Sequence, residues 1–169
     1  MAEENTTPAA DAGAQEVPAQ HFSMQRLYLK DASYEAPMGV EAFKQQWKPN
    51  VNQDLNTKTT KVDEDLFEVT LTLTITVKLG EDDTAFLVEV QQAGLFLIKG
   101  LEGQPLAQVL NTTCPQILFP YAREAVDNIV TKGSFPPLML PPINFDVLFA
   151  QAVAQAQKNA EAAENQPAN

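Results

Sequence analysis

The sequence predicts an α+β fold, a four-stranded antiparallel sheet with helices packed on one face. Two observations predict this class. Residues 67–79 alternate strictly between apolar and polar side chains, and residues 118–132 repeat their apolar side chains with the period of a helix. Strand-like segments come first and helix-like segments follow, without an internal repeat. This order is typical of an antiparallel sheet whose helices are segregated to one side.

The clearest strands lie in the middle of the chain. In 67–79 every odd position is apolar and every even position polar, which predicts a strand with one buried and one wet face. The Gly and acidic residues of 80–83 favour a turn, so the apolar segment 85–98 is expected to return antiparallel. Its apolar phase changes at Ala93 and Gly94, where a bulge or bend is expected.

Two weaker strands precede this pair. Residues 22–36 alternate weakly and are predicted to form a first strand, mixed on both faces, in which Leu27 and Leu29 share a face with Asp31. The segments expected between this strand and the central pair are a helical turn at 40–46 and a polar strand at 50–62.

Helices are expected in the second half of the chain. A short apolar helix is predicted at 106–110, followed by the amphipathic helix of 118–132. Proline deep inside a helix costs about 3 kcal/mol, so this helix either begins at Pro120 or is kinked there after an earlier turn from Pro115. A last helix is expected after Asn144, which is a good N-cap.

The segment GSFPPLMLPPI at 133–143 cannot be helical, because its four prolines fix their own backbone angles and extend the preceding residues. Its apolar side chains either cover the core or line a surface groove. The same alternatives apply to a wider set of apolar residues on irregular segments, since aromatic and Met side chains suit an adaptable groove as well as a core. This set comprises Trp47, Val51, Leu55, Phe135, Leu138, Met139, Leu140 and Phe145.

Composition restricts the classes of function. The 169 residues suffice for one domain, and 22 acidic against 11 basic residues give a net charge of −11, which disfavours nucleic acid and favours a basic partner. Residues 1–21 are interpreted as a disordered acidic tail, and 150–169 as the end of the last helix followed by a disordered tail. Because no apolar run is long enough to insert in a bilayer and a single Cys forms no internal disulfide, a cytoplasmic protein is expected.

Catalytic chemistry has little support. His21 is the only histidine, so a multi-histidine metal site or a catalytic histidine is not expected. Cys114 lies in an apolar run without a partner motif and is interpreted as a small buried side chain, with a hydrolase nucleophile as a distant alternative. The GLEG motif lacks the Lys and hydroxyl of a phosphate loop, and the acidic turn at 81–83 lacks the spacing of a calcium loop. The sequence thus predicts neither an enzyme nor a bound cofactor or metal.

Several long blocks closely resemble the SecB protein-export chaperones of bacteria. They are QRLYLKDASYEAP (25–37), LFEVTLTLTITVKLG (66–80), AFLVEVQQAGLFLIKGLEG (85–103) and CPQILFPYAREAVDNIVTKGSFPPLMLPPINFDVLF (114–149), within a SecB-like domain of 22–149. The resemblance implies a homotetramer, a dimer of dimers. This assembly would hold unfolded preproteins in the cytoplasm as an ATP-independent holdase and deliver them to the translocation ATPase SecA. The alternative is a small hydrophobic-ligand binding protein that uses the Pro-rich pocket.

The resemblance also implies roles for particular residues. The positions that match SecA contacts are Asp31, Glu35, Leu87 and Glu89, which the alternation of the strands places on one wet sheet face. The positions that match the tetramer interface are Phe86, Val88, Val90 and Gln92, on the opposite face. The family's peptide groove corresponds to the apolar set of Trp47, Val51, Leu55, Phe135, Leu138, Met139, Leu140 and Phe145.

Overall fold

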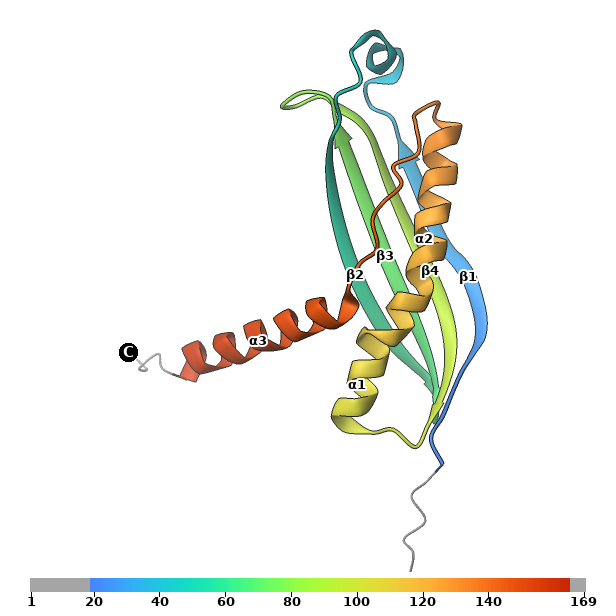
Figure 1. Ribbon diagram of the computed structural model, residues 1–169, viewed down its shortest axis with the longest axis vertical. Helices are drawn as coiled ribbons and strands as arrows, with labels where there is room; N and C mark the ends of the chain where they lie inside the picture. The colour runs from blue at the N-terminus through green and yellow to red at the C-terminus, as the bar shows by residue number, and fades with distance from the viewer. Residues whose placement is uncertain (1–18, 165–169) are drawn as a thin grey trace, which may run out of the picture.

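The computed structural model describes residues 19–164 and contains one long sheet with its helices on one side (Figure 1). The strands, in chain order, are β1 (His21–Glu35), β2 (Asn50–Asp63), β3 (Leu66–Lys78) and β4 (Thr84–Lys99). They lie in the order β1-β4-β3-β2, and each neighbouring pair is antiparallel. The predicted fold class is therefore confirmed.

The helical elements are the 3-10 helix η1 (Gly39–Lys44), α1 (Gly103–Asn111), α2 (Thr113–Lys132) and α3 (Phe145–Glu164). The chain crosses from β1 at one sheet edge to β2 at the other, and η1 lies in this crossover. Figure 1 shows α2 lying lengthwise on one side of the sheet, while α3 projects away from it. We call the side covered by α2 the helix face and the opposite side the open face.

The core lies between α2 and the two central strands. Every odd residue of β3 from Val69 to Val77 is fully buried, as the alternation predicts. On β4 the even residues from Phe86 to Ile98 are buried in the same layer. The residues of α2 that meet them are Leu118, Ala122, Val126 and Val130. Burying a side chain of this size contributes about 1.5–3 kcal/mol, so this layer is the main source of stability.

The bulge expected at Ala93 and Gly94 is absent, and that prediction was wrong. β4 pairs with β3 without a register shift from Leu66 to Val77, so its alternation is continuous through Gly94. The glycine has a packing role instead. A Cβ at Gly94 would lie 2.6 Å from Cε2 of Phe96 and 3.0 Å from Cδ2 of Leu118, so the missing side chain lets α2 approach the sheet.

We expect Gly94→Ala to lower the free energy of unfolding by about 1–3 kcal/mol, because the new methyl group overpacks the contact with α2. Gly80→Ala is the matched control, since a Cβ there would meet only the flexible side chain of Asp83, at 3.3 Å. Urea unfolding of both variants measures the difference. Equal stabilities would contradict a packing role for Gly94.

β1 does carry bulges, at positions the sequence did not indicate. Its pairing with β4 shifts between Met24 and Arg26 and again between Leu29 and Asp31. Because of the second shift, Leu29 pairs with Gln92 on the helix face while Asp31 pairs with Gln91 on the open face. The expectation that these two residues share a face was wrong, because one extra residue reverses the alternation.

The helix boundaries distinguish the two alternatives for Pro120. α2 begins at Thr113, so Pro120 lies inside the helix and an earlier turn does precede it. The predicted cap of α3 is confirmed, since the backbone N–H of Val147 donates to Oδ1 of Asn144 at 3.1 Å. The segment between α2 and α3 is not helical, as its prolines require.

Candidate binding surfaces

The four residues predicted to contact SecA lie together on the open face. In the β1–β4 ladder, Glu35 pairs with Leu87, Ser33 with Glu89 and Asp31 with Gln91. Side chains of directly paired residues lie on the same side of a sheet, so the ladder brings the three carboxylates to one face. With about 3.3 Å per residue, Asp31 and Glu35 are separated by about 13 Å. We call Asp31, Glu35, Leu87 and Glu89 the acidic patch.

The carboxylates of the acidic patch have no salt bridge with any Lys or Arg of residues 19–164. Glu89 instead accepts a hydrogen bond from the Thr74 hydroxyl at 3.1 Å. Three unpaired carboxylates on one face attract a cationic partner.

Another open-face carboxylate, Glu68, is neutralised within the chain. Lys30 Nζ lies 2.7 Å from its Oε2, and Tyr28 donates a hydrogen bond to its Oε1. The hydrogen bond from Lys30, with that from Tyr28, lowers the pKa of Glu68. The bond to Glu68 raises the pKa of Tyr28 to about 12. Glu68 is therefore paired within the chain, whereas the three carboxylates of the acidic patch are available to a partner.

The residues predicted at the tetramer interface lie on the helix face, beneath α2. Phe86, Val88 and Val90 are fully buried and belong to the core. Gln92 is 5% exposed, and its Nε2 donates to the backbone carbonyl of Tyr28 on β1 at 2.9 Å. These side chains are covered by their own chain and cannot contact a second protomer directly. They can affect an interface only by positioning the helix that covers them.

An aromatic cluster joins the crossover to the Pro-rich segment. The ring of Phe135 lies 4.8 Å from Phe86, 5.1 Å from Phe43 and 5.4 Å from Trp47, measured between centroids. Phe135 is 5% exposed, but Phe43, on η1, is 56% exposed. Sequence reasoning missed Phe43. The signal that could have found it is its spacing of four residues from Trp47 in a segment that otherwise lacks an apolar pattern.

The predicted groove residues on β2 face the same side as this cluster. Val51 pairs with Val77 and Leu55 with Leu73, whose side chains are buried on the helix face. Since α2 packs on β4 and β3, β2 is the outer strand of this face, and Val51 remains 40% exposed. Leu138 is partly buried against the core. We call the surface formed by these residues and the cluster the apolar surface: Phe43, Trp47, Val51, Leu55, Phe135 and Leu138.

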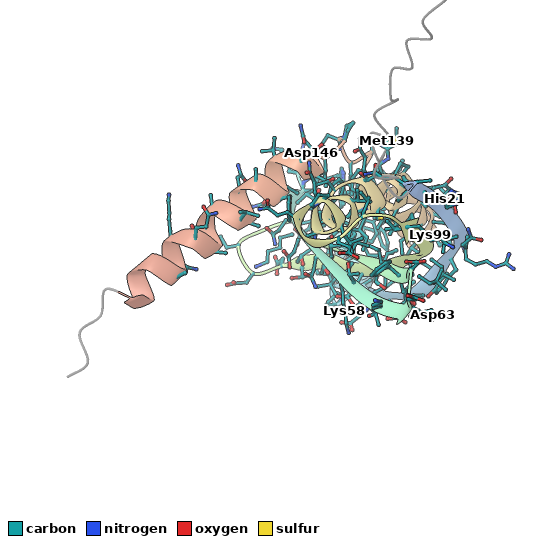
Figure 2. The ribbon with its side chains drawn as sticks, turned by 90° about the horizontal axis from the view of Figure 1, so that it is seen from below. His21, Lys58, Asp63, Lys99, Met139 and Asp146 are labelled. Carbon is teal, nitrogen blue, oxygen red and sulfur yellow. The ribbon has the colours of Figure 1, made fainter. Side chains whose placement is uncertain are left out.

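The remaining predicted groove residues lie elsewhere. Leu140 is 5% exposed within the core, and Phe145 packs edge-on against Phe119 at 6.1 Å where α3 begins. The side chain of Met139 is 74% exposed. Figure 2 shows Met139 on the side of the helices, far from Lys58 and Asp63 of β2. The structure therefore divides the predicted groove set between one exposed apolar surface and separate sites.

Cys114 is a buried structural residue, as predicted. Its side chain is fully buried in α2, and burial raises the pKa of the thiol to about 12. The sulfur is protonated at neutral pH, and a protonated thiol is a poor nucleophile.

We expect Cys114→Ser to lower the free energy of unfolding by about 1–3 kcal/mol, because the hydroxyl loses hydrogen bonds to water on burial. Binding by the folded variant should match that of the parent, since Cys114 lies on neither binding surface. Thermal unfolding and a binding titration of the same sample measure both. A folded variant that no longer binds would contradict a structural role.

Two further features bear on function. Residues 19–164 contain no group of three or more His, Cys, Asp or Glu side chains arranged to hold a metal ion. In the same part of the chain, none of the helices combines the length and apolar character needed to cross a membrane.

Comparison with known proteins identifies the family of this chain. The family profile described as "Preprotein translocase subunit SecB" matches residues 15–156. The "Protein-export protein SecB" of Cellvibrio japonicus is 56% identical over 161 residues, which are 95% of this chain and 94% of that protein. The protein of the same name from Pseudomonas paraeruginosa is 52% identical, over 92% of this chain and 95% of its own length.

A solved structure supports the same fold. A SecB-like chaperone of Mycobacterium tuberculosis, in complex with a ChAD peptide from an antitoxin, superposes with a TM-score of 0.59 at 18% identity. The superposition covers 73% of this chain and 91% of that one. The extent of the profile match and the identity to full-length relatives together show that this chain belongs to the SecB family of protein-export chaperones.

Proposed function

We propose that this protein is an ATP-independent holdase that binds apolar stretches of unfolded preproteins and delivers them to SecA in the cytoplasm. The observation that carries the proposal is the apolar surface. Phe43 and Val51 keep about half of their side-chain surface exposed beside a packed aromatic cluster. Such surface is unfavourable in water unless a partner covers it. Membership of the SecB family supports a polypeptide as that partner.

Capture is explained by the physical chemistry of exposed apolar groups. Each apolar side chain of a client that is buried on the apolar surface contributes about 1.5–3 kcal/mol. Folded proteins hide most such side chains, so selectivity is for the unfolded state. Several copies of the surface in one assembly would strengthen binding through avidity.

Delivery to SecA is assigned to the acidic patch. The patch lies on the open face and the apolar surface on the helix face, so the sheet separates them. A client and SecA can therefore occupy the protein at the same time. Surface charge gives such an encounter its orientation and speed more than its strength.

We also propose that the working form is a homotetramer, a dimer of dimers. Phe86, Val88, Val90 and Gln92 would influence assembly by fixing α2 on the sheet, since all four are covered within the chain. Substitutions there would act on assembly through the placement of α2.

The alternative is a small hydrophobic-ligand binding protein. The hollow beside the Pro-rich segment, between Phe119 and Ile143, measures about 270 Å³. Drug-sized ligands usually occupy about 300–1,000 Å³. The hollow lies just below the lower end of this range, and its lining includes the polar side chains Gln116 and Arg123.

The test is suppression of aggregation. An unrelated protein is diluted from denaturant in the absence of nucleotide, with and without this protein, and light scattering is followed. We expect scattering to fall as the ratio of chaperone to client rises. Unchanged scattering, together with tight binding of a small apolar dye, would favour the alternative.

A further inference from the structure

We propose that Arg123 and Asp127 of α2 are positioning residues that hold the Pro-rich segment in the conformation needed for client binding. This inference rests on the proposed holdase function. It concerns residues on the helix, which contribute to the apolar surface only through the segment that they hold.

The contacts are directed at the backbone of the segment. Oδ1 of Asp127 accepts hydrogen bonds from the N–H groups of Leu138 at 2.8 Å and of Met139 at 3.4 Å. Nη1 of Arg123 donates to the carbonyl oxygen of Leu140 at 3.2 Å. Arg123 and Asp127 are four residues apart, so they lie on the same side of α2 and act on three consecutive residues.

These hydrogen bonds matter because the segment has little to hold itself in place. Its prolines donate no hydrogen bond, and Met139 adopts φ 51°, a left-handed conformation that is uncommon for a non-Gly residue. A carboxylate that accepts backbone N–H groups forms stronger bonds than a neutral acceptor does. Asp127 therefore has the chemistry required to hold Met139 in this conformation.

The side chains of the held residues differ in exposure. Leu138 is partly buried and Leu140 is 5% exposed, whereas Met139 between them is 74% exposed. At the start of the segment, the N–H of Phe135 donates to the carbonyl of Val130 at 3.3 Å. The segment is thus attached to α2 at Phe135 and again at residues 138–140, so the backbones of both Phe135 and Leu138 of the apolar surface are held by the helix.

The test compares Asp127→Ala with the control Glu124→Ala. Glu124 is on the same helix, and its carboxylate accepts a hydrogen bond from Asn128 at 2.6 Å. We expect faster amide hydrogen exchange at Leu138 in Asp127→Ala and an unchanged rate in Glu124→Ala. The affinity for reduced, carboxymethylated α-lactalbumin, a permanently unfolded probe, should fall about tenfold in Asp127→Ala alone.

Asp127→Asn separates positioning from charge. Its amide oxygen can still accept both backbone N–H groups, so this variant should restore most of the affinity and the protection at Leu138. If Asp127→Ala does not fold, Arg123→Met, which keeps the aliphatic stem and removes the donor, should give the same direction of change.

Three outcomes overturn the inference: an Asp127→Ala affinity equal to that of Glu124→Ala, faster exchange without loss of affinity, or an Asp127→Asn defect as large as that of Ala. A parent protein that does not bind the unfolded probe would instead reject the proposed holdase function. The two failures are therefore distinguishable.

Discussion

Asp31→Ala combined with Glu89→Ala is expected to weaken binding to SecA by about 10- to 100-fold at low salt, in the range measured for close charge pairs at interfaces. The two carboxylates lie on neighbouring strands of the open face without a cationic partner in residues 19–164. A basic surface of SecA would pair with both. Exposed charges contribute about 0–1 kcal/mol to folding, so the variant should remain as stable as the parent.

Titration of SecA at several salt concentrations measures this effect. The advantage of the parent should shrink as salt rises, because the Debye length falls to about 10 Å at 0.1 M. Glu68→Gln is the matched control, since Glu68 lies on the same face but is already paired with Lys30 at 2.7 Å. Its affinity for SecA should stay close to that of the parent. Parent-like binding by the double variant at low salt would show that the acidic patch is not the SecA site.

Val51→Asp is expected to reduce the affinity for an unfolded client by about 10- to 100-fold, since the change removes one apolar contact and adds a charge that must lose water. Val51 is 40% exposed on the helix face of β2, so the carboxylate remains hydrated in the free protein. The free energy of unfolding should therefore change little. SecA binding should be unaffected, because Val51 and the acidic patch lie on opposite faces.

Val62→Asp is a close control for this prediction. Val62 lies near the far end of the same strand and is 57% exposed, so both variants place the same new charge on β2. Fluorescence anisotropy with a labelled, permanently unfolded protein measures the two affinities. Equal losses would indicate a general effect of negative charge, and the apolar surface would not be the client site.

The central hairpin could be predicted because the alternation of apolar and polar residues along each strand determines which side chains are buried. β3 buries its apolar side chains on the helix face and places its polar side chains on the open face, so its sequence alternates strictly and gives both the strand and its orientation. The same alternation assigned Leu87 and Glu89 to one face of β4 and Phe86 and Val88 to the other. Local sequence contains this information wherever a strand pairs regularly.

Irregular pairing could not be predicted in this way. The bulges of β1 depend on how its backbone fits β4, and no residue near Leu29 marks them. At Gly94, in contrast, the sequence suggested a bulge that is absent. The role of this glycine depends on its close approach to Leu118, 24 positions later in the chain. Both errors arise from long-range contacts that a local pattern does not contain.

The binding surfaces were predictable to different degrees. Strand alternation predicts that the residues of the acidic patch share one face. Asp31 and Glu35 lie on the same face as Glu89 because of the second bulge of β1. The apolar surface combines β2, the crossover and the Pro-rich segment, and Phe43 was missed because η1 is too short to show a period. Met139 lies apart from the other groove residues, in a left-handed conformation that its sequence does not indicate.

The second bulge of β1 also affects which inherited deletions the strand can tolerate. Lys30 is the extra residue between Leu29 and Asp31, whose partners Gln92 and Gln91 are adjacent on β4. Loss of the Lys30 codon would remove the bulge and leave every other side chain of the strand on its present face. Loss of the Leu27 codon would move Tyr28 and Leu29 each to the face opposite its present one. The register would be restored only from Asp31 onward, where the extra residue of the bulge compensates for the deletion. Length variation in this strand is therefore expected at Lys30 in preference to its neighbours.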